Sequence, residues 1–261
     1  MTDLTFGTVY LVGAGPGDPE LLTVKANRLL KSCDALVYDS LVPKELLDLV
    51  PENCQTYFVG KRRGHHSVPQ GRTNQILCEM AQSKSIIVRL KGGDPFLFGR
   101  GAEEAAYLIR KGVPVQVVPG ITSGIAVPAY LGIPVTHRLA GSSVTFVTGH
   151  EGIDKRRPAV NWKGLATSTD TLVIYMGVHN LDTISEELIQ GGLDPSTPAI
   201  VIQQGTVIGQ RFIKESLSKI AIKAQSEQYK SPAIVMIGKA IEYQVFDSAP
   251  DPADVTMPIP F

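Results

Sequence analysis

This sequence of 261 residues has few cysteines, no excess of either charge, and no leader in which a basic segment precedes an apolar one. The cysteines, Cys33, Cys54 and Cys78, are odd in number and too widely spaced for a zinc knuckle. We interpret them as reduced packing residues of a cytoplasmic protein. Because the formal net charge is zero, no overall field attracts the chain to nucleic acid or to an anionic membrane. No signal peptide is expected.

One long stretch without formal charge, residues 112–136, has the length of a membrane span. Four prolines and several glycines interrupt it, and such breaks leave backbone groups unsatisfied in lipid. A strand, a turn and a short helix are therefore expected there, and no membrane partner.

The first half of the chain alternates short apolar runs with longer runs of helical period, which is typical of a parallel sheet covered on both faces. Strands are expected over residues 8–15, 34–40, 55–60, 85–95 and 113–120, and helices over 72–82 and 102–111. Asp18 and Pro19 are typical of the N-cap and first position of a further helix. The apolar face of that helix would hold Leu21, Leu22, Ala26, Leu29 and Leu30.

The second half of the chain differs from the first, because an additional run of alternating polar and apolar residues, 207–216, predicts an extra strand and hence a mixed sheet. Strands are expected over 142–150, 170–177, 197–205, 207–216 and 231–240, and helices over 180–190 and 215–225. We predict an α/β protein with an N-terminal domain over 8–119, a C-terminal domain over 120–243 and a proline-rich tail over 244–261. Ligands of open α/β sheets bind beyond the carboxyl ends of the strands, so a cleft between the two domains is the expected site.

The segment "LVGAGPGDPELLTV" (11–24) resembles a dinucleotide-binding loop in part. Asp18 stands where the last fingerprint glycine is expected, and Pro16 lacks an N–H group that a pyrophosphate would need. Asp39, about twenty residues further on, would suit a ribose-binding acid. Two alternatives stay open: a tight turn with only a structural role, and a loop that shapes a pocket without holding phosphate.

A basic run, "GKRRGHHSVPQGR" (60–72), follows the third predicted strand, and no Asp or Glu occurs over residues 53–78. Arginine forks match carboxylates and phosphates, so the run favours capture of a polyanion, although a solvated surface is the alternative. The adjacent histidines, His65 and His66, have no third ligand at helical spacing, and no metal site is expected.

Further candidates lie at the ends of other predicted strands. Gly92 and Gly93 allow close approach of backbone to a ligand, and Asp94 adds a carboxylate, although "GGDP" is also a good turn. Arg100 lies between two glycines, where its guanidinium can reach the cleft. In the second half, Met176 and the run "QQGT" (203–206) also end strands.

Taken together, the segments "VYLVGAGPGDPELLTVKA", "YDSLV", "VGKRRGHHSVPQ", "VRLKGGDPFLFGRGAEE", "VPGITS" and "GIPVTHR" resemble the motifs of the tetrapyrrole methylases. The resemblance covers about residues 8–243, nearly the whole chain. The loop "GPGDP" is common to many members, whereas the basic run combined with "GGDPFLFGRG" resembles the narrower branch that methylates uroporphyrinogen III. One small departure is Ser123 with Gly124, where relatives often carry alanines.

This resemblance implies a homodimer that uses S-adenosylmethionine, with S-adenosylhomocysteine as product. It implies two successive methylations of uroporphyrinogen III, at carbons 2 and 7, through precorrin-1 to precorrin-2, for sirohaem or cobalamin synthesis. The implied donor-binding residues are Pro16, Gly92, Gly93, Asp94, Leu97, Thr122, Ser123, Met176, Gly205 and Ala233. The implied proton acceptor is Asp39, and the alternative is loss of the proton to solvent. The implied proton donor is Lys61, and the alternative is that Lys61 and Arg63 only hold carboxylates. Substrate contacts are expected from Arg62, Arg63, His65, Arg100 and Tyr130.

Three alternatives remain for the function. They are a methylase of a later corrin precursor, an RNA or protein methylase of the same fold, and a tetrapyrrole carrier without catalysis. The zero net charge argues against RNA.

Overall fold

The protein, described here by a computed structural model over residues 6–60, 69–149 and 160–246, divides into two compact units. The first ends at Thr122 and the second begins at Ser123. The predicted boundary, between residues 119 and 120, falls just before this division. Each unit is built on a five-stranded sheet.

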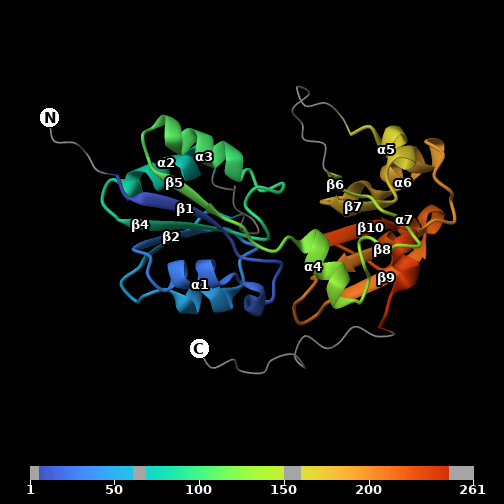
Figure 1. The fold of residues 1–261 in the computed structure, drawn as a ribbon, viewed down its shortest axis with the longest axis horizontal. Coiled ribbons are helices and arrows are strands. Elements are labelled where there is room, and N and C mark those ends of the chain that lie inside the picture. Colours follow the sequence, from blue (N-terminus) through green and yellow to red (C-terminus); the bar gives the residue numbers. More distant parts are fainter. Residues whose placement is uncertain (1–5, 61–68, 150–159, 247–261) are drawn as a thin grey trace. The chain divides into compact units, whose positions relative to one another are not determined.

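The first unit has a parallel sheet in the order β3-β2-β4-β1-β5. Its strands are β1 (Thr8–Gly13), β2 (Ala35–Tyr38), β3 (Gln55–Phe58), β4 (Ile86–Lys91) and β5 (Val115–Val118). Its helices are α1 (Val24–Leu30), α2 (Gln70–Ala81) and α3 (Gly101–Arg110), with 3-10 turns η1 (Pro19–Leu21) and η2 (Lys44–Leu49). Figure 1 shows α2 and α3 on one face of this sheet and α1 on the other.

Alternation along β4 explains how one strand serves both faces. Ile87 packs in the apolar cluster under α2 and α3, whereas Val88 and Leu90 pack in the cluster beside α1. Successive side chains of a strand point to opposite faces, so Arg89 and Lys91 lie on the same face as Ile87. Two cations are thus placed under α2 and α3, in the interior of the unit.

The second unit has a mixed sheet in the order β6-β7-β10-β8-β9. Its strands are β6 (Val144–Thr148), β7 (Thr171–Tyr175), β8 (Pro198–Gln203), β9 (Arg211–Ser216) and β10 (Ala233–Gly238). Its helices are α4 (Ser123–Tyr130), α5 (Trp162–Ser168), α6 (Leu181–Gln190) and α7 (Leu217–Ser226), with 3-10 turns η3 (Val178–Asn180) and η4 (Lys239–Tyr243). One apolar cluster joins α5, α6 and α7 to the sheet, and a second joins α4 and η4 to it. The predicted fold class, a parallel sheet followed by a mixed sheet that includes the extra strand, is confirmed.

Two local predictions differ from the structure. Asp18 does accept a hydrogen bond as a cap, from the N–H of Glu20, but it caps the 3-10 turn η1. The α-helix begins later, where the hydroxyl oxygen of Thr23 accepts from the N–H of Ala26. Helix α5, of seven residues, was not predicted from the sequence.

The charge-free stretch contains β5, a turn and α4, as predicted. None of the helices within the described ranges is both long and apolar enough to cross a membrane. The start of the predicted tail packs on the second unit, since the N–H of Val245 donates to the carbonyl of Gly132 at 3.0 Å. Residues 247–261 of the tail lie outside the described part of the chain.

Three glycines allow the ends of β1, β4 and β5 to touch through their backbones. A Cβ atom on Gly13 would lie 2.5 Å from the Cα of Gly120 and 2.5 Å from the carbonyl oxygen of Gly93. A Cβ atom on Gly120 would overlap that same carbonyl oxygen. A side chain at either position would therefore push the loops apart.

We expect Gly120→Ala to destabilise the first unit by about 1–3 kcal/mol, because the added methyl group overpacks against rigid backbone. Thermal unfolding followed by circular dichroism measures the change. The control is Gly71→Ala, in α2, where a Cβ atom meets nothing within 4 Å and a helical alanine should raise stability by about 0.5–1 kcal/mol. Equal melting temperatures for Gly120→Ala and the unsubstituted protein would contradict this packing.

Candidate functional site

The glycine-rich loop after β1 uses its own N–H groups to hold the loop after β4. The N–H of Ala14 donates to the carbonyl of Lys91 at 2.7 Å, and Gly15 and Gly93 exchange hydrogen bonds of 3.2 and 2.7 Å. Pro16 follows and has no N–H group. Because the N–H groups of Ala14 and Gly15 are already used and Pro16 has none, these three positions offer no N–H group to a pyrophosphate. A dinucleotide site is therefore disfavoured.

Asp94 joins a third loop to this pair. Its Oδ2 atom accepts from the N–H of Gly120 at 3.1 Å, and its Oδ1 atom accepts from the N–H of Phe96 at 2.8 Å. The loop after β4 is thus tied to the loop after β5 by a carboxylate that is half-buried. Gly92, Gly93 and Asp94 come together with Pro16 at the carboxyl edge of the first sheet, which leaves Gly93 with open space where a side chain would stand.

The loop after β2 reaches the same edge. A Cβ atom on Gly92 would lie 2.6 Å from the Cβ of Leu41, so only glycine fits under this side chain. The N–H of Leu41 donates to Oδ1 of Asp39 at 3.2 Å. Asp39 therefore lies in the turn that contacts the Gly92 loop, and its side chain is 24% exposed.

Behind Asp39, a cluster of charged side chains is buried in the first unit. The Nη2 atom of Arg89 lies 3.6 Å from Oδ2 of Asp39, and its Nε atom lies 3.3 Å from Oε1 of Glu104. The Nζ atom of Lys91 lies 3.2 Å from the same Glu104 oxygen. Two cations thus face two carboxylates. Removing one partner of such a buried set costs about 3–5 kcal/mol, because it leaves a charge uncompensated.

The environment of Lys91 makes its charge dependent on its partners. Burial lowers the pKa of Lys91, the neighbouring charge of Arg89 lowers it further, and Glu104 opposes both effects. The buried Oε2 atom of Glu104 accepts no hydrogen bond from any described residue. One carboxylate oxygen therefore supports both cations of β4.

Arg100 and Leu97 lie further along the loop after β4. The Nη2 atom of Arg100 pairs with Oε2 of Glu103 at 2.7 Å on the exposed surface. This exposed pair accounts for the raised pKa of Arg100 and contributes little stability. Leu97 is half-buried. Arg100 is therefore held by α3 at the sheet edge, in reach of solvent.

The second unit gathers three of its expected donor-binding residues at one edge because β10 runs antiparallel to its neighbours. Ala233, at the start of β10, pairs in register with Gln203, the last residue of β8. Ile234 pairs with Tyr175, the last residue of β7. Since Met176 follows β7 and Gly205 follows β8, both lie at the edge where Ala233 begins β10.

The first turn of α4 reaches this same edge. The N–H of Gly124 donates to the hydroxyl of Tyr175 at 2.8 Å, and a Cβ atom on Gly124 would overlap that hydroxyl. Gly205 packs directly on the methyl groups of Val127 from the same helix. Ser123 is thereby placed beside the strand ends, while Thr122 ends the first unit and Tyr130 lies at the far end of α4.

Backbone strain concentrates in the loops after β4, β7 and β8. Of the six non-glycine residues with left-handed backbone in the described ranges, five lie in these loops: Phe98, Arg100, Met176, Gln204 and Thr206. Such residues cost about 1–3 kcal/mol each and cluster at functional sites. Met176 combines a φ of 56° with 45% exposure, which core packing does not explain.

Several predicted residues lie outside the described part of the chain: Lys61, Arg62, Arg63, His65 and His66. Within the described ranges, no group of three or more His, Cys, Asp or Glu side chains is arranged to hold a metal ion. The three cysteines are free, and burial is the main cause that raises the pKa of Cys33, Cys54 and Cys78. A thiol whose pKa is raised stays protonated at neutral pH and is a poor nucleophile.

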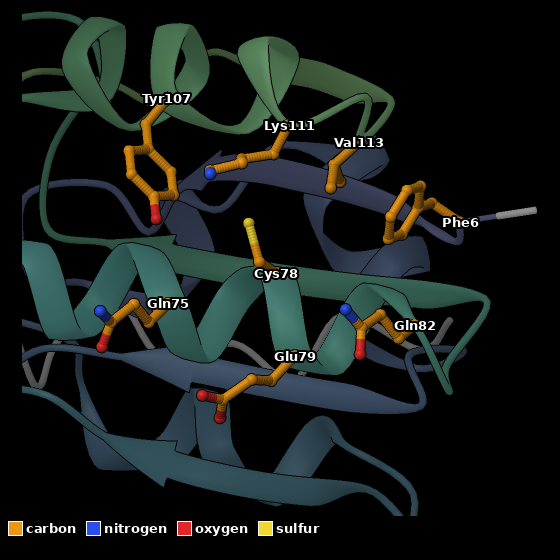
Figure 2. Close-up of a pocket in the computed structure, with 8 residues that line it drawn as sticks. All are labelled: Phe6, Gln75, Cys78, Glu79, Gln82, Tyr107, Lys111 and Val113. Atoms are coloured by element: carbon orange, nitrogen blue, oxygen red, sulfur yellow. The ribbon is translucent and has the colours of Figure 1, made fainter. Parts of the chain in front are cut away.

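A separate hollow lies between α2 and α3, and Figure 2 shows Cys78 of α2 facing Tyr107 of α3 and Lys111, the residue after α3, across it. Phe6 and Val113, which also line it, precede β1 and β5. The hollow is therefore at the amino end of these strands, opposite the edge that holds the glycine loops.

The residues that the sequence analysis missed are the buried ones, Arg89, Lys91 and Glu104. A signal was available, because Arg89 and Lys91 stand two residues apart in a strand that is otherwise apolar. Period-two alternation puts both on one buried face, where a counter-charge is required.

Comparisons with known proteins agree with this arrangement. The family model for tetrapyrrole (corrin/porphyrin) methylases matches residues 8–221. The uroporphyrinogen-III C-methyltransferase of Synechocystis sp. is 49% identical over 91% of this chain and 90% of its own length. The S-adenosyl-L-methionine-dependent uroporphyrinogen III methyltransferase of Methanosarcina barkeri is 48% identical over 90% of this chain and 92% of its own.

Solved structures give the same result. The uroporphyrin-III C-methyl transferase of Thermus thermophilus, solved in complex with S-adenyl homocysteine, superposes with a TM-score of 0.77. It is 38% identical, and the match covers 90% of this chain and 99% of that structure. The resemblance seen in the sequence motifs is thus confirmed: this chain belongs to the tetrapyrrole methylase family.

Proposed function

We propose that this protein transfers methyl groups from S-adenosylmethionine to uroporphyrinogen III. The observation that carries the proposal is identity near one half, over nine tenths of the chain, to two enzymes with this activity in their names. The finer steps follow the sequence motifs: methylation at carbons 2 and 7, through precorrin-1 to precorrin-2, for sirohaem or cobalamin synthesis. We further propose that the enzyme acts as a homodimer in the cytoplasm, where its free thiols stay reduced.

The described residues fit the methyl donor, whose bound sulfonium supplies the methyl group. A cationic sulfonium with an adenosyl group needs apolar surface and backbone oxygens rather than a phosphate cradle. The exposed side chain of Met176 provides apolar surface, and the open space at Gly93 allows close approach to backbone. We assign donor binding to the set named from the motifs: Pro16, Gly92, Gly93, Asp94, Leu97, Thr122, Ser123, Met176, Gly205 and Ala233.

We assign the many carboxylates of the tetrapyrrole to the basic run and its neighbours. The net charge of the whole chain is zero, yet residues 53–78 contain no Asp or Glu. The cations of this run are therefore not neutralised by acids nearby in the sequence, and they can pair with the carboxylates of the substrate. A charge-assisted hydrogen bond contributes about 1.5–3 kcal/mol, so a few such bonds suffice to select a polycarboxylate. The proposed contacts are Arg62, Arg63, His65, Arg100 and Tyr130.

The reaction does not require a nucleophilic side chain, because the pyrrole carbon that accepts the methyl group is already electron-rich. In-line placement of the two reactants can contribute about 7–11 kcal/mol. After methyl transfer the ring must lose a proton, and we assign its acceptance to Asp39 and proton donation to Lys61. The position of Asp39 at the carboxyl edge, partly exposed and held by Leu41, supports this assignment.

The first test offers the purified protein uroporphyrinogen III and donor labelled in its methyl group, without oxygen. We expect two labelled methyl groups in each macrocycle, identified by mass spectrometry. Label in a later corrin precursor but not in uroporphyrinogen III would favour a later methylase of the same family. Binding of uroporphyrinogen III without any label transfer would favour a carrier.

Arg63→Glu should raise the KM for uroporphyrinogen III by at least about tenfold, because it replaces a charge-assisted hydrogen bond with repulsion. The affinity for S-adenosylhomocysteine, measured by calorimetry, should change by less than about twofold. The matched control is Arg28→Glu, an exposed arginine in the last turn of α1. Equal weakening of substrate and donor product by Arg63→Glu would refute the proposed division of roles.

Met176→Asp should weaken the binding of S-adenosylhomocysteine by at least about tenfold, because it places an unpaired carboxylate against the adenosyl group. The control is Ile222→Asp, the same kind of change at an exposed position of α7. Calorimetry on both variants measures the effect. If Met176→Asp binds as the control does, Met176 has no contact with the donor.

A further inference from the structure

Glu104 is a fully buried carboxylate on a helix face that is otherwise apolar. Its Oε1 atom accepts from Nε2 of Gln70 at 2.8 Å, as well as from Lys91 and Arg89. Apolar residues of similar volume usually stabilise a fold as well as a buried ion cluster does. Stability alone therefore does not explain why α3 presents a carboxylate to the sheet.

Arg89 connects Glu104 to the proposed site. One end of its guanidinium, Nε, bonds Glu104, while Nη1 donates to the carbonyl of Leu90 at 3.0 Å and Nη2 faces Asp39 at 3.6 Å. The planar group is thus fixed in orientation by two acceptors before it meets Asp39. The second oxygen of Asp39 accepts from the N–H of Leu41.

Lys91 connects the same carboxylate to the loop after β4. Its Cε atom would lie 3.3 Å from a Cβ atom on Gly99, so its side chain runs beneath this loop. Its own carbonyl oxygen accepts from the N–H of Ala14 in the glycine loop. Burial lowers the pKa of Lys91, and the negative charge of Glu104 raises it. Glu104 therefore favours the charged form of Lys91 and keeps the ion cluster intact.

We propose that Glu104 is a positioning residue for the proton loss that follows methyl transfer: it holds Arg89 against Asp39 and thereby fixes the carboxylate that accepts the proton. This inference rests on the proposed function and on the role assigned to Asp39. It makes Glu104 act at a distance, through Arg89, on a group that meets the substrate.

The test is a double-mutant cycle with Glu104→Gln, Asp39→Asn and the double variant, in which the absorption spectrum of the methylated product is followed under single-turnover conditions to give the rate constant of proton loss. Glu104→Gln should lower the rate constant about tenfold, a coupling within the range for residues in one hydrogen-bonded network. In the Asp39→Asn background the same change should lower it less than about twofold. The affinity for S-adenosylhomocysteine should stay within about twofold in all variants.

The control is Glu79→Gln, which removes an exposed carboxylate paired with Arg72 at 2.9 Å and should leave the rate constant unchanged. If Glu104→Gln does not fold, Glu104→Asp replaces it, because it keeps the buried charge and withdraws the oxygen from Arg89. Equal losses in both backgrounds would reduce Glu104 to a structural role and overturn the inference. An unchanged rate for Asp39→Asn would overturn it too. Absence of methyl transfer by the unsubstituted protein would instead refute the proposed function.

Discussion

The backbone contact among Gly13, Gly93 and Gly120 is the constraint on which the carboxyl edge of the first sheet depends. Three parallel strands end there with no side chain between them, so the loops that follow are joined by main-chain hydrogen bonds and by the Asp94 carboxylate. Because these backbone N–H groups donate to other loops, they are not available to bind a ligand at this edge. A loop whose N–H groups are engaged offers carbonyl oxygens and small apolar surface, which suit a sulfonium, and offers no cradle for phosphate.

The second unit also brings loops together at one edge of its sheet, but it does so through strand direction and not through contacts between glycines. Its sheet is mixed, and the antiparallel strand β10 begins where β7 and β8 end, so residues far apart in sequence meet at one edge. Non-glycine residues take left-handed backbone in the loops after β7 and β8, where the first unit relies more on glycine. In both units a regular sheet holds the ends of the irregular loops and so fixes the positions of the loop residues.

The sequence predicted both sheets, the extra strand and most helices, because alternation and helical period are local properties. It did not separate η1 from α1, since Asp18, Pro19 and Thr23 all carry signals that begin a helix. The motifs identified the strand-end residues, but the ion cluster of Arg89, Lys91 and Glu104 was missed. Alternation along β4 indicates that Arg89 and Lys91 share a buried face, but the choice of Glu104 as their partner depends on the tertiary packing of α3. The double function of Asp94, whose side chain binds two backbone N–H groups, was hidden for the same reason.

The central claim is that glycine-rich strand ends, rather than the hollow between α2 and α3, receive the methyl donor. A crystal structure of the protein with S-adenosylhomocysteine tests it most directly. We expect the bound molecule to lie against the backbone of Gly92 and Gly93. Density for the molecule beside Cys78 and Tyr107, with those glycines uncovered, would contradict it.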